Sequence, residues 1–193
     1  MPHSSAASYW ESVWAAGRRY RQLDDAEIAL LTQHLGAGHG RPALDIGCGS
    51  GELSHHLHQY LGYRVTGIDC APSALALAAS CDRDESEPGP TWRLMDFATD
   101  DVTKLPDPAY TAVTCRLVYT FIDDKPDFLD RVRRVLAPGG TFWVLTELAG
   151  RFDDNDPRKS LGITDHDIEL LTTGWSSVTT VDIDRLRCFA LRP

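Results

Sequence analysis

Residues 43–53 read Ala43-Leu44-Asp45-Ile46-Gly47-Cys48-Gly49-Ser50-Gly51-Glu52-Leu53, and they carry the strongest structural signal in the chain. Residues 43–46 are typical of a short buried strand, and residues 52–61 place leucines on one side of a helix. Glycines at alternate positions join the two elements. Glycine lets the backbone turn and approach a ligand closely, and a helix N-terminus presents unpaired N–H groups. The stretch therefore predicts a strand–loop–helix unit with a ligand site at the loop.

The spacing of these glycines indicates the charge of that ligand. Dinucleotide-binding loops have the spacing G-x-G-x-x-G, which seats a pyrophosphate at the helix N-terminus. Here the spacing is G-x-G-x-G, Glu52 takes the place of the third glycine of that pattern, and Asp45 precedes the loop. Carboxylates at this position are poorly suited to a pyrophosphate. We therefore expect a ligand that is neutral or cationic beside the loop.

Strands and helices alternate through the rest of the chain. We expect strands at 43–46, 64–68, 91–95, 110–115 and 141–146, with helices at 52–61, 72–79, 124–136 and 164–173. This alternation implies right-handed βαβ units and a mostly parallel sheet. The final strand-like runs, 177–183 and 187–191, are too close for a parallel crossover and must form an antiparallel hairpin. We predict an α/β fold with a single seven-stranded, mostly parallel sheet and helices on both faces.

Two further helices are expected before the sheet, at 7–20 and 24–35. We expect residues 1–40 to form a helical cap over the ligand site and residues 41–193 to form the ligand-binding domain. The length of 193 residues favours one globular domain.

Composition limits the partners and the compartment. The formal net charge of −9 argues against a nucleic-acid surface, which depends on Lys and Arg contacts. The 5 cysteines include no C-x-x-C pair, so we expect reduced thiols in a reducing cytoplasm rather than disulfides or zinc. The N-terminus lacks the features of a signal peptide, and no apolar run is long enough to cross a membrane. We expect a cytoplasmic monomer or homodimer.

The chain resembles class I S-adenosylmethionine-dependent methyltransferases of the small-molecule type. Residues 45–51 resemble the family's first motif, D-x-G-x-G-x-G. Residues 65–69 resemble its second strand with a terminal acid, and residues 94–97 its third. Residues 129–140 resemble the helix and L-x-P-G-G turn before the fifth strand. The resemblance covers about residues 40–192 and implies a Rossmann-like fold with S-adenosylmethionine as cofactor.

The resemblance also implies a set of cofactor-binding residues. Asp69 is expected to bind the ribose hydroxyls, Asp96 the adenine amino group, and Phe97 the face of the adenine ring. The full set is Asp45, Gly47, Cys48, Gly49, Gly51, Asp69, Cys70, Asp96, Phe97, Cys115, Arg116 and Tyr20. Structural alternatives stay open for two of them: Asp69 as the N-cap of the following helix, and Asp96 as a turn residue.

Two other groups of side chains have both a functional and a structural interpretation. Trp10, Trp14 and Tyr20 either cover the methionine end of the cofactor or pack in the core, and helical spacing favours packing. The histidines of residues 55–58 suggest a metal site. Their helix buries leucines on its other side, so we expect solvated histidines and no metal.

The catalytic residue is not evident from the sequence. Methyl transfer from a sulfonium depends mainly on positioning, and a general base is needed only where the acceptor loses its proton early. Tyr119 and Glu147, after the strands at 110–115 and 141–146, are candidates, although structural roles are favoured for both. The Asn/Asp-Pro-Pro-Tyr/Phe segment of many family members that methylate amide or exocyclic amino groups does not follow residue 115. We therefore expect O- or N-methylation of a small-molecule acceptor.

Two alternative functions stay open. One is another transferase on the same scaffold, such as an aminopropyl transferase that uses the decarboxylated cofactor. The other is a non-catalytic module that binds the cofactor and regulates a partner. Methyl incorporation from labelled cofactor separates the first from a methyltransferase, and binding without transfer indicates the second.

Overall fold

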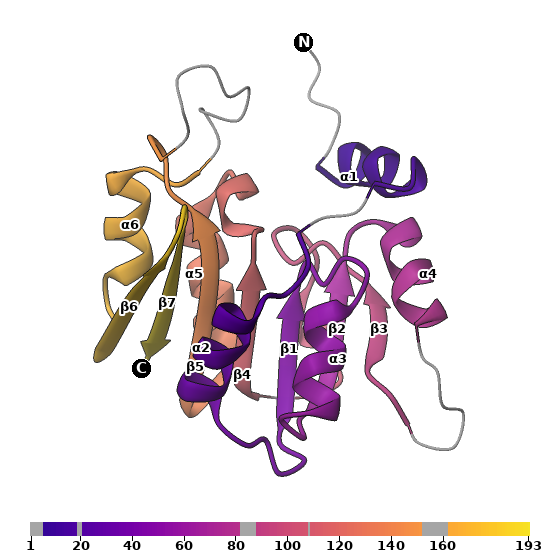
Figure 1. The fold of residues 1–193 in the computed structure, drawn as a ribbon, viewed down its shortest axis with the longest axis horizontal. Coiled ribbons are helices and arrows are strands. Elements are labelled where there is room, and N and C mark those ends of the chain that lie inside the picture. Colours follow the sequence, from indigo (N-terminus) through magenta and orange to yellow (C-terminus); the bar gives the residue numbers. More distant parts are fainter. Residues whose placement is uncertain (1–5, 19–20, 82–87, 108, 152–161) are drawn as a thin grey trace.

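A computed structural model describes residues 6–18, 21–81, 88–107, 109–151 and 162–193. Its strands form one seven-stranded sheet in the order β3-β2-β1-β4-β5-β7-β6 (Figure 1). The strands are β1 (Pro42–Ile46), β2 (Arg64–Asp69), β3 (Thr91–Leu94), β4 (Tyr110–Arg116), β5 (Leu136–Glu147), β6 (Ser177–Ile183) and β7 (Leu186–Arg192).

The strand directions confirm the predicted topology. β1 to β5 run parallel to their neighbours, while β7 lies antiparallel between β5 and β6. The order reverses at β1, whose neighbours are β2 and β4. Ligands of open α/β sheets bind at the carboxyl ends of the strands beside such a reversal.

Helices cover both faces of the sheet, as predicted. They are α1 (Ala6–Ala15), α2 (Asp25–Leu35), α3 (Glu52–Gln59), α4 (Pro72–Ser80), α5 (Lys125–Val135) and α6 (Asp165–Thr172), with short 3₁₀ turns η1 (Val102–Lys104) and η2 (Tyr119–Phe121). Side chains alternate between the faces of a strand. Ala43 of β1 accordingly packs with leucines of α2 and α3, whereas Leu44 and Ile46 pack with apolar residues of α5.

The fifth strand begins earlier than expected. The sequence predicts a helix to residue 136 and a strand from residue 141, but α5 ends at Val135 and β5 follows at once from Leu136. The backbone at Gly139 turns through a φ of 73°, and the pairing of β4 with β5 shifts register between Tyr110 and Ala112. The Pro-Gly-Gly segment is therefore an irregularity within a long strand rather than a loop before a short one.

Helix α1 stands apart from the layers of the sheet. Figure 1 places it at the top of the view, beyond the ends toward which the parallel strands point. Its packing is mainly against α4, where Trp14 forms a small apolar cluster with Ala71 and Ala74. Across the described parts of the chain, no helix combines the length and apolar character needed to cross a bilayer.

Candidate functional site

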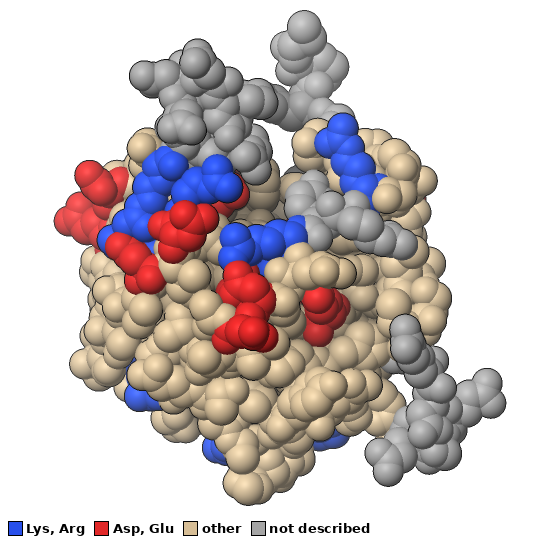
Figure 2. Space-filling view, viewed as in Figure 1, with Lys and Arg blue, Asp and Glu red and all other residues tan. Residues whose placement is uncertain are grey.

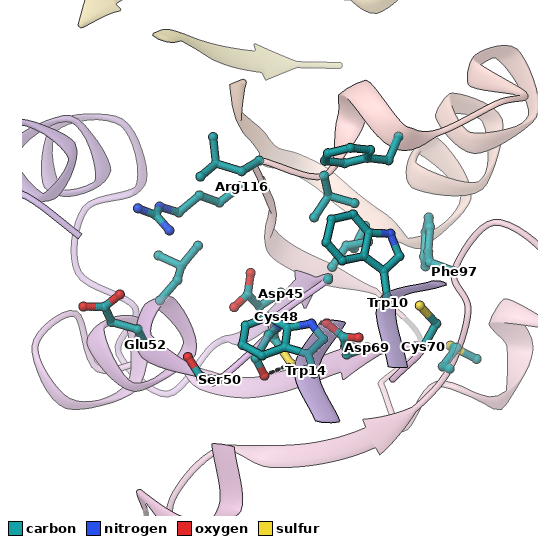
Figure 3. A pocket seen from close by; sticks show the side chains of 18 of the residues that line it. Trp10, Trp14, Asp45, Cys48, Ser50, Glu52, Asp69, Cys70, Phe97 and Arg116 are labelled. Atoms are coloured by element: carbon teal, nitrogen blue, oxygen red, sulfur yellow. Dashed lines mark hydrogen bonds between the residues drawn. The ribbon is translucent and has the colours of Figure 1, made fainter. Parts of the chain in front are cut away.

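A cavity of about 1050 Å³ opens at the carboxyl ends of the parallel strands. It is formed by the segments that follow β1, β2, β3 and β4, with α1 at one side (Figure 3). The predicted cofactor residues that line it are Asp45, Gly47, Cys48, Gly49, Asp69, Cys70, Asp96, Phe97 and Arg116. The topology therefore brings together side chains that lie more than 70 positions apart in the sequence.

The loop after β1 depends on glycine for space as well as for conformation. Gly47 and Gly49 have φ angles of 67° and 54°, in the left-handed region that favours glycine. A Cβ atom on Gly47 would lie 2.4 Å from Val118 Cγ2, and one on Gly49 would lie 2.8 Å from Trp14 Cζ2. The loop is thus packed between the residues after β4 and the indole of α1, with its backbone facing the cavity.

Asp69, at the end of β2, fixes this loop. Its Oδ2 accepts a hydrogen bond from the Gly49 N–H at 2.9 Å, and its Oδ1 accepts one from the Ala71 N–H at 2.9 Å. Burial raises the pKa of Asp69, and these backbone hydrogen bonds oppose the rise. The N-cap alternative for Asp69 is wrong, because α4 begins after Ala71. The carboxylate lies at the cavity wall, where it can bind hydroxyl donors.

Asp45 is almost completely buried beneath the loop, with 1% of its surface exposed. Its carboxylate accepts hydrogen bonds from Ser54 Oγ at 2.6 Å and Thr114 Oγ1 at 2.8 Å. Burial raises the pKa of Asp45 from 3.8 to about 6, despite the opposing effect of the two hydroxyl groups. At neutral pH the carboxylate is therefore ionised and places negative charge at the cavity wall.

We predict that Asp45→Asn gains stability relative to wild type as pH rises from about 4 to about 6. The folded state holds a proton on Asp45 up to about pH 6, whereas the unfolded chain loses it near 3.8. The stability that wild type has at low pH is lost over this window and does not change above it. The relative gain is about 3 kcal/mol at most. Urea unfolding of both proteins between pH 4 and 7 measures it, and a difference in stability that does not depend on pH would contradict it.

The opposite side of the cavity carries Cys70, Asp96 and Phe97. Asp96 Oδ1 accepts a hydrogen bond from the Ala98 N–H at 3.0 Å, so the turn interpretation holds and Asp96 lines the cavity as well. Phe97 packs edge-on against Phe128, with ring centroids 5.4 Å apart. Burial raises the pKa of Cys70 to about 12, which makes this thiol a packing group rather than a reactive one.

Four predicted residues do not reach the cavity wall. Gly51 precedes α3 and packs against Trp92, and Cys115 is fully buried in the core. Glu147 lies at the end of β5, paired with Leu186, and neither it nor Tyr119 lines the cavity. Tyr20 lies outside the described residues.

Tyr119 was placed incorrectly because the chain turns sharply after β4. Leu117 adopts a φ of 59°, and η2 follows with three residues per turn. Residues 118 and 121 therefore share one side and line the cavity, while Tyr119 points into the core and is fully buried. Burial also raises the pKa of its hydroxyl.

The aromatic residues of α1 line the cavity, which the sequence left open. Trp10 contacts the Phe121 ring edge-on, with centroids 4.8 Å apart, and Trp14 lies over Gly49. Trp14 also packs on α4, so it combines the two interpretations. The sequence gave no separate signal for Val118 or Phe121 beyond an apolar run after β4.

The histidines of α3 are half-buried rather than solvated. The His55 ring lies 5.3 Å from that of Trp92, and the His56 ring stacks on Tyr60 at 5.0 Å. Within the described residues, no group of His, Cys, Asp and Glu is arranged to hold a metal ion.

Comparison with known proteins places this cavity in a family. A model described as a methyltransferase domain matches residues 44–144. A ubiquinone biosynthesis O-methyltransferase of Alkalilimnicola ehrlichii is 28% identical over 136 residues, which cover 70% of this chain and 53% of that protein. The corresponding enzyme of Burkholderia multivorans is 28% identical over 148 residues, covering 77% and 61%. The chain thus spans somewhat more than half the length of these curated relatives.

Solved structures share the fold. A phosphoethanolamine N-methyltransferase 2 of Haemonchus contortus, in complex with S-adenosyl-L-methionine, has a TM-score of 0.74 at 15% identity and covers 100% of this chain and 58% of that one. A SAM-dependent methyltransferase of Aquifex aeolicus has a TM-score of 0.68 at 16% identity, with 86% and 87% covered. Both matches confirm the predicted Rossmann-like architecture.

Proposed function

Because this chain belongs to the methyltransferase domain family, we propose that it transfers a methyl group from S-adenosylmethionine to an oxygen or nitrogen atom of a small-molecule acceptor. One observation carries the proposal: the Asp69 carboxylate is hydrogen-bonded to the glycine loop at the wall of a cavity of about 1050 Å³. The names of the curated relatives support methyl transfer to oxygen.

The residues of the cavity fit this cofactor. Its volume is at the upper end of the range for ligand pockets, roughly 300–1,000 Å³, which leaves space for a nucleoside and an acceptor together. The buried carboxylates of Asp45 and Asp69 beside the loop suit a cationic ligand and disfavour a pyrophosphate. We expect Asp69 to bind the ribose hydroxyls, Asp96 the adenine amino group, and Phe97 the adenine face.

The role of the protein in the reaction is positioning. The bound cofactor supplies a methyl group on a positively charged sulfur with a neutral leaving group. Trp10, Val118 and Phe121 form an apolar wall that can exclude water and orient the acceptor. Holding two reactants in line lowers a barrier by roughly 7–11 kcal/mol in favourable cases. A dedicated base is therefore not required for the reaction.

We also propose that residues 1–40 act as a cap on the site. The Glu11 carboxylate of α1 accepts hydrogen bonds from the Ser73 N–H at 3.0 Å and from Ser73 Oγ at 2.6 Å. Together with the packing of Trp14 on α4, these bonds hold the helix over Gly49. The cap then closes the cofactor site against solvent.

The acceptor class follows from charge and scale. The net charge is −9, and in Figure 2 the described arginines and lysines of the drawn face are interspersed with acids rather than gathered into a basic surface. We propose a small molecule rather than a nucleic acid, acted on by a monomer or homodimer. The 5 cysteines are all free in the structure, which supports a reducing, cytoplasmic location.

The proposal is tested with methyl-labelled S-adenosylmethionine and a panel of catechols, phenols and primary amines. We expect labelled product together with S-adenosylhomocysteine in amounts that depend on the acceptor. If the protein binds the cofactor but methylates no member of a broad panel, the non-catalytic module is favoured. If it transfers an aminopropyl group from the decarboxylated cofactor instead, the other transferase alternative is correct.

A further inference from the structure

A buried carboxylate joins two arginines at the end of the cavity away from Phe97. Glu27 of α2 has no exposed surface. Its Oε1 accepts a hydrogen bond from Arg21 Nε at 2.9 Å, and its Oε2 accepts one from Arg116 Nε at 2.6 Å. An unpaired carboxylate buried in this way would be strongly destabilising. Two guanidinium groups compensate for it and leave one net positive charge in the cluster.

The Arg116 guanidinium is fixed on one edge and available on the other. Besides the bond from Nε, its Nη2 donates to the carbonyl oxygens of Arg21 and Gln22 at 2.9 and 3.1 Å. Its side chain is 11% exposed and lines the cavity, at the left of Figure 3. Among the described residues Nη1 has no hydrogen-bond acceptor, so a rigidly held donor remains for a ligand.

Arg21 is held in a similar way. Its Nε donates to Glu27 and its Nη2 to Asp24, and the side chain also lines the cavity. Nη1 of Arg21 likewise has no acceptor among the residues that the structure describes. Glu27 therefore sets the position of both arginines, although it is not part of the cavity wall itself.

The remaining charges of the cavity make this corner distinct. Arg21 and Arg116 are the only arginine or lysine side chains among the described lining residues. The acids on the wall are Asp45, Glu52, Asp69, Asp96, Asp123 and Asp124. An anionic group that enters the cavity is therefore stabilised only at the arginines. One net positive charge matches a carboxylate, whereas a phosphate dianion would add uncompensated charge to an acidic cavity.

We propose that Arg116 and Arg21, positioned by Glu27, form a binding subsite for a carboxylate group. The subsite rests on the proposed function, because that carboxylate belongs either to the amino-acid end of the cofactor or to the acceptor. If it belongs to the cofactor, the subsite selects S-adenosylmethionine over its decarboxylated form and disfavours aminopropyl transfer.

The test compares the affinities of S-adenosylmethionine and decarboxylated S-adenosylmethionine, measured by calorimetry. A hydrogen bond to a charged group contributes roughly tenfold to a hundredfold in affinity. We expect wild type to prefer the carboxylated ligand by about that factor, and Arg116→Met to lose the preference while its affinity for the decarboxylated ligand stays unchanged. Arg116→Lys should recover part of it, and Glu27→Gln should reduce it.

Two further variants keep the comparison interpretable. Arg187→Met removes an arginine that is also held by a carboxylate, that of Asp182, but lies away from the cavity, and it should keep the full preference. Arg21→Met removes the more exposed member of the pair, 37% exposed, so it reports on the subsite even where the Arg116 variant does not fold. It should lower the preference in part.

A second arm tests the acceptor as the source of the carboxylate, with benzoate and benzamide as probes on the protein saturated with S-adenosylhomocysteine. Benzoate binding that requires Arg116, in a wild type that does not distinguish the two cofactors, assigns the subsite to the acceptor. If neither preference exists, or if Arg116→Met weakens both cofactors equally, the subsite is wrong. If wild type binds neither cofactor, it is the proposed function that fails.

Discussion

Replacing Gly49 by alanine is expected to weaken S-adenosylmethionine binding at least tenfold and to lower the stability of the fold. A non-glycine residue in the left-handed region costs about 1–2 kcal/mol, and here the φ is 54°. The new Cβ would also lie 2.8 Å from Trp14 Cζ2 and 3.0 Å from Cη2. Either the indole or the loop must move, so the proposed cap and the hydrogen bond from Gly49 to Asp69 are disturbed together. Calorimetric affinity and urea unfolding measure the two effects.

Gly139→Ala is the matched control for this substitution. Gly139 has a φ of 73°, and a Cβ there would have no neighbouring atom within 4 Å. We expect a similar loss of stability, again about 1–2 kcal/mol, without a change in affinity. An equal loss of affinity in both variants would mean that backbone strain alone, and not the site, governs binding. Unchanged affinity in Gly49→Ala would show that α1 does not cap the loop.

Replacing Asp69 by alanine is expected to weaken cofactor binding about a hundredfold or more. The carboxylate accepts the Gly49 and Ala71 N–H groups, and in the proposed complex it also binds the ribose hydroxyls. The substitution removes the hydroxyl acceptors and releases the loop that they adjoin. The affinity for S-adenosylhomocysteine, measured by calorimetry, reports the loss, and circular dichroism checks that the variant is folded.

Asp101→Ala controls for the loss of a carboxylate that caps a turn. Asp101 accepts the Thr103 N–H at 3.0 Å and does not line the cavity, so its affinity for the cofactor should match that of wild type. If Asp69→Ala also binds as wild type does, Asp69 is a loop support and the expected ribose contact is wrong.

The sequence was most informative where local chemistry and topology agree. The loop from Asp45 to Gly51 combines a buried strand, residues that permit positive φ and a helix start, and the structure has all three. The antiparallel hairpin followed from chain length alone, because a short connection permits no crossover. Most residues implied by the family resemblance line one cavity for the same reason: they lie where parallel strands end.

The missed features depend on tertiary contacts that leave no pattern in the sequence. Tyr119 was misplaced because the left-handed turn at Leu117 is set by surrounding packing rather than by its residue type. Glu27 has the position of an ordinary acid in the first turn of a helix. Its burial between Arg21 and Arg116 joins α2 to the end of β4, across 89 positions from Glu27 to Arg116.

Calorimetric titration of the wild-type chain with S-adenosylhomocysteine is the decisive measurement, because every role assigned to the cavity requires that a sulfur nucleoside binds at the glycine loop. We predict saturable binding with one site per chain, weakened strongly by Asp69→Ala and not by Asp101→Ala. A folded wild-type protein that gives no saturable heat at millimolar ligand would contradict it.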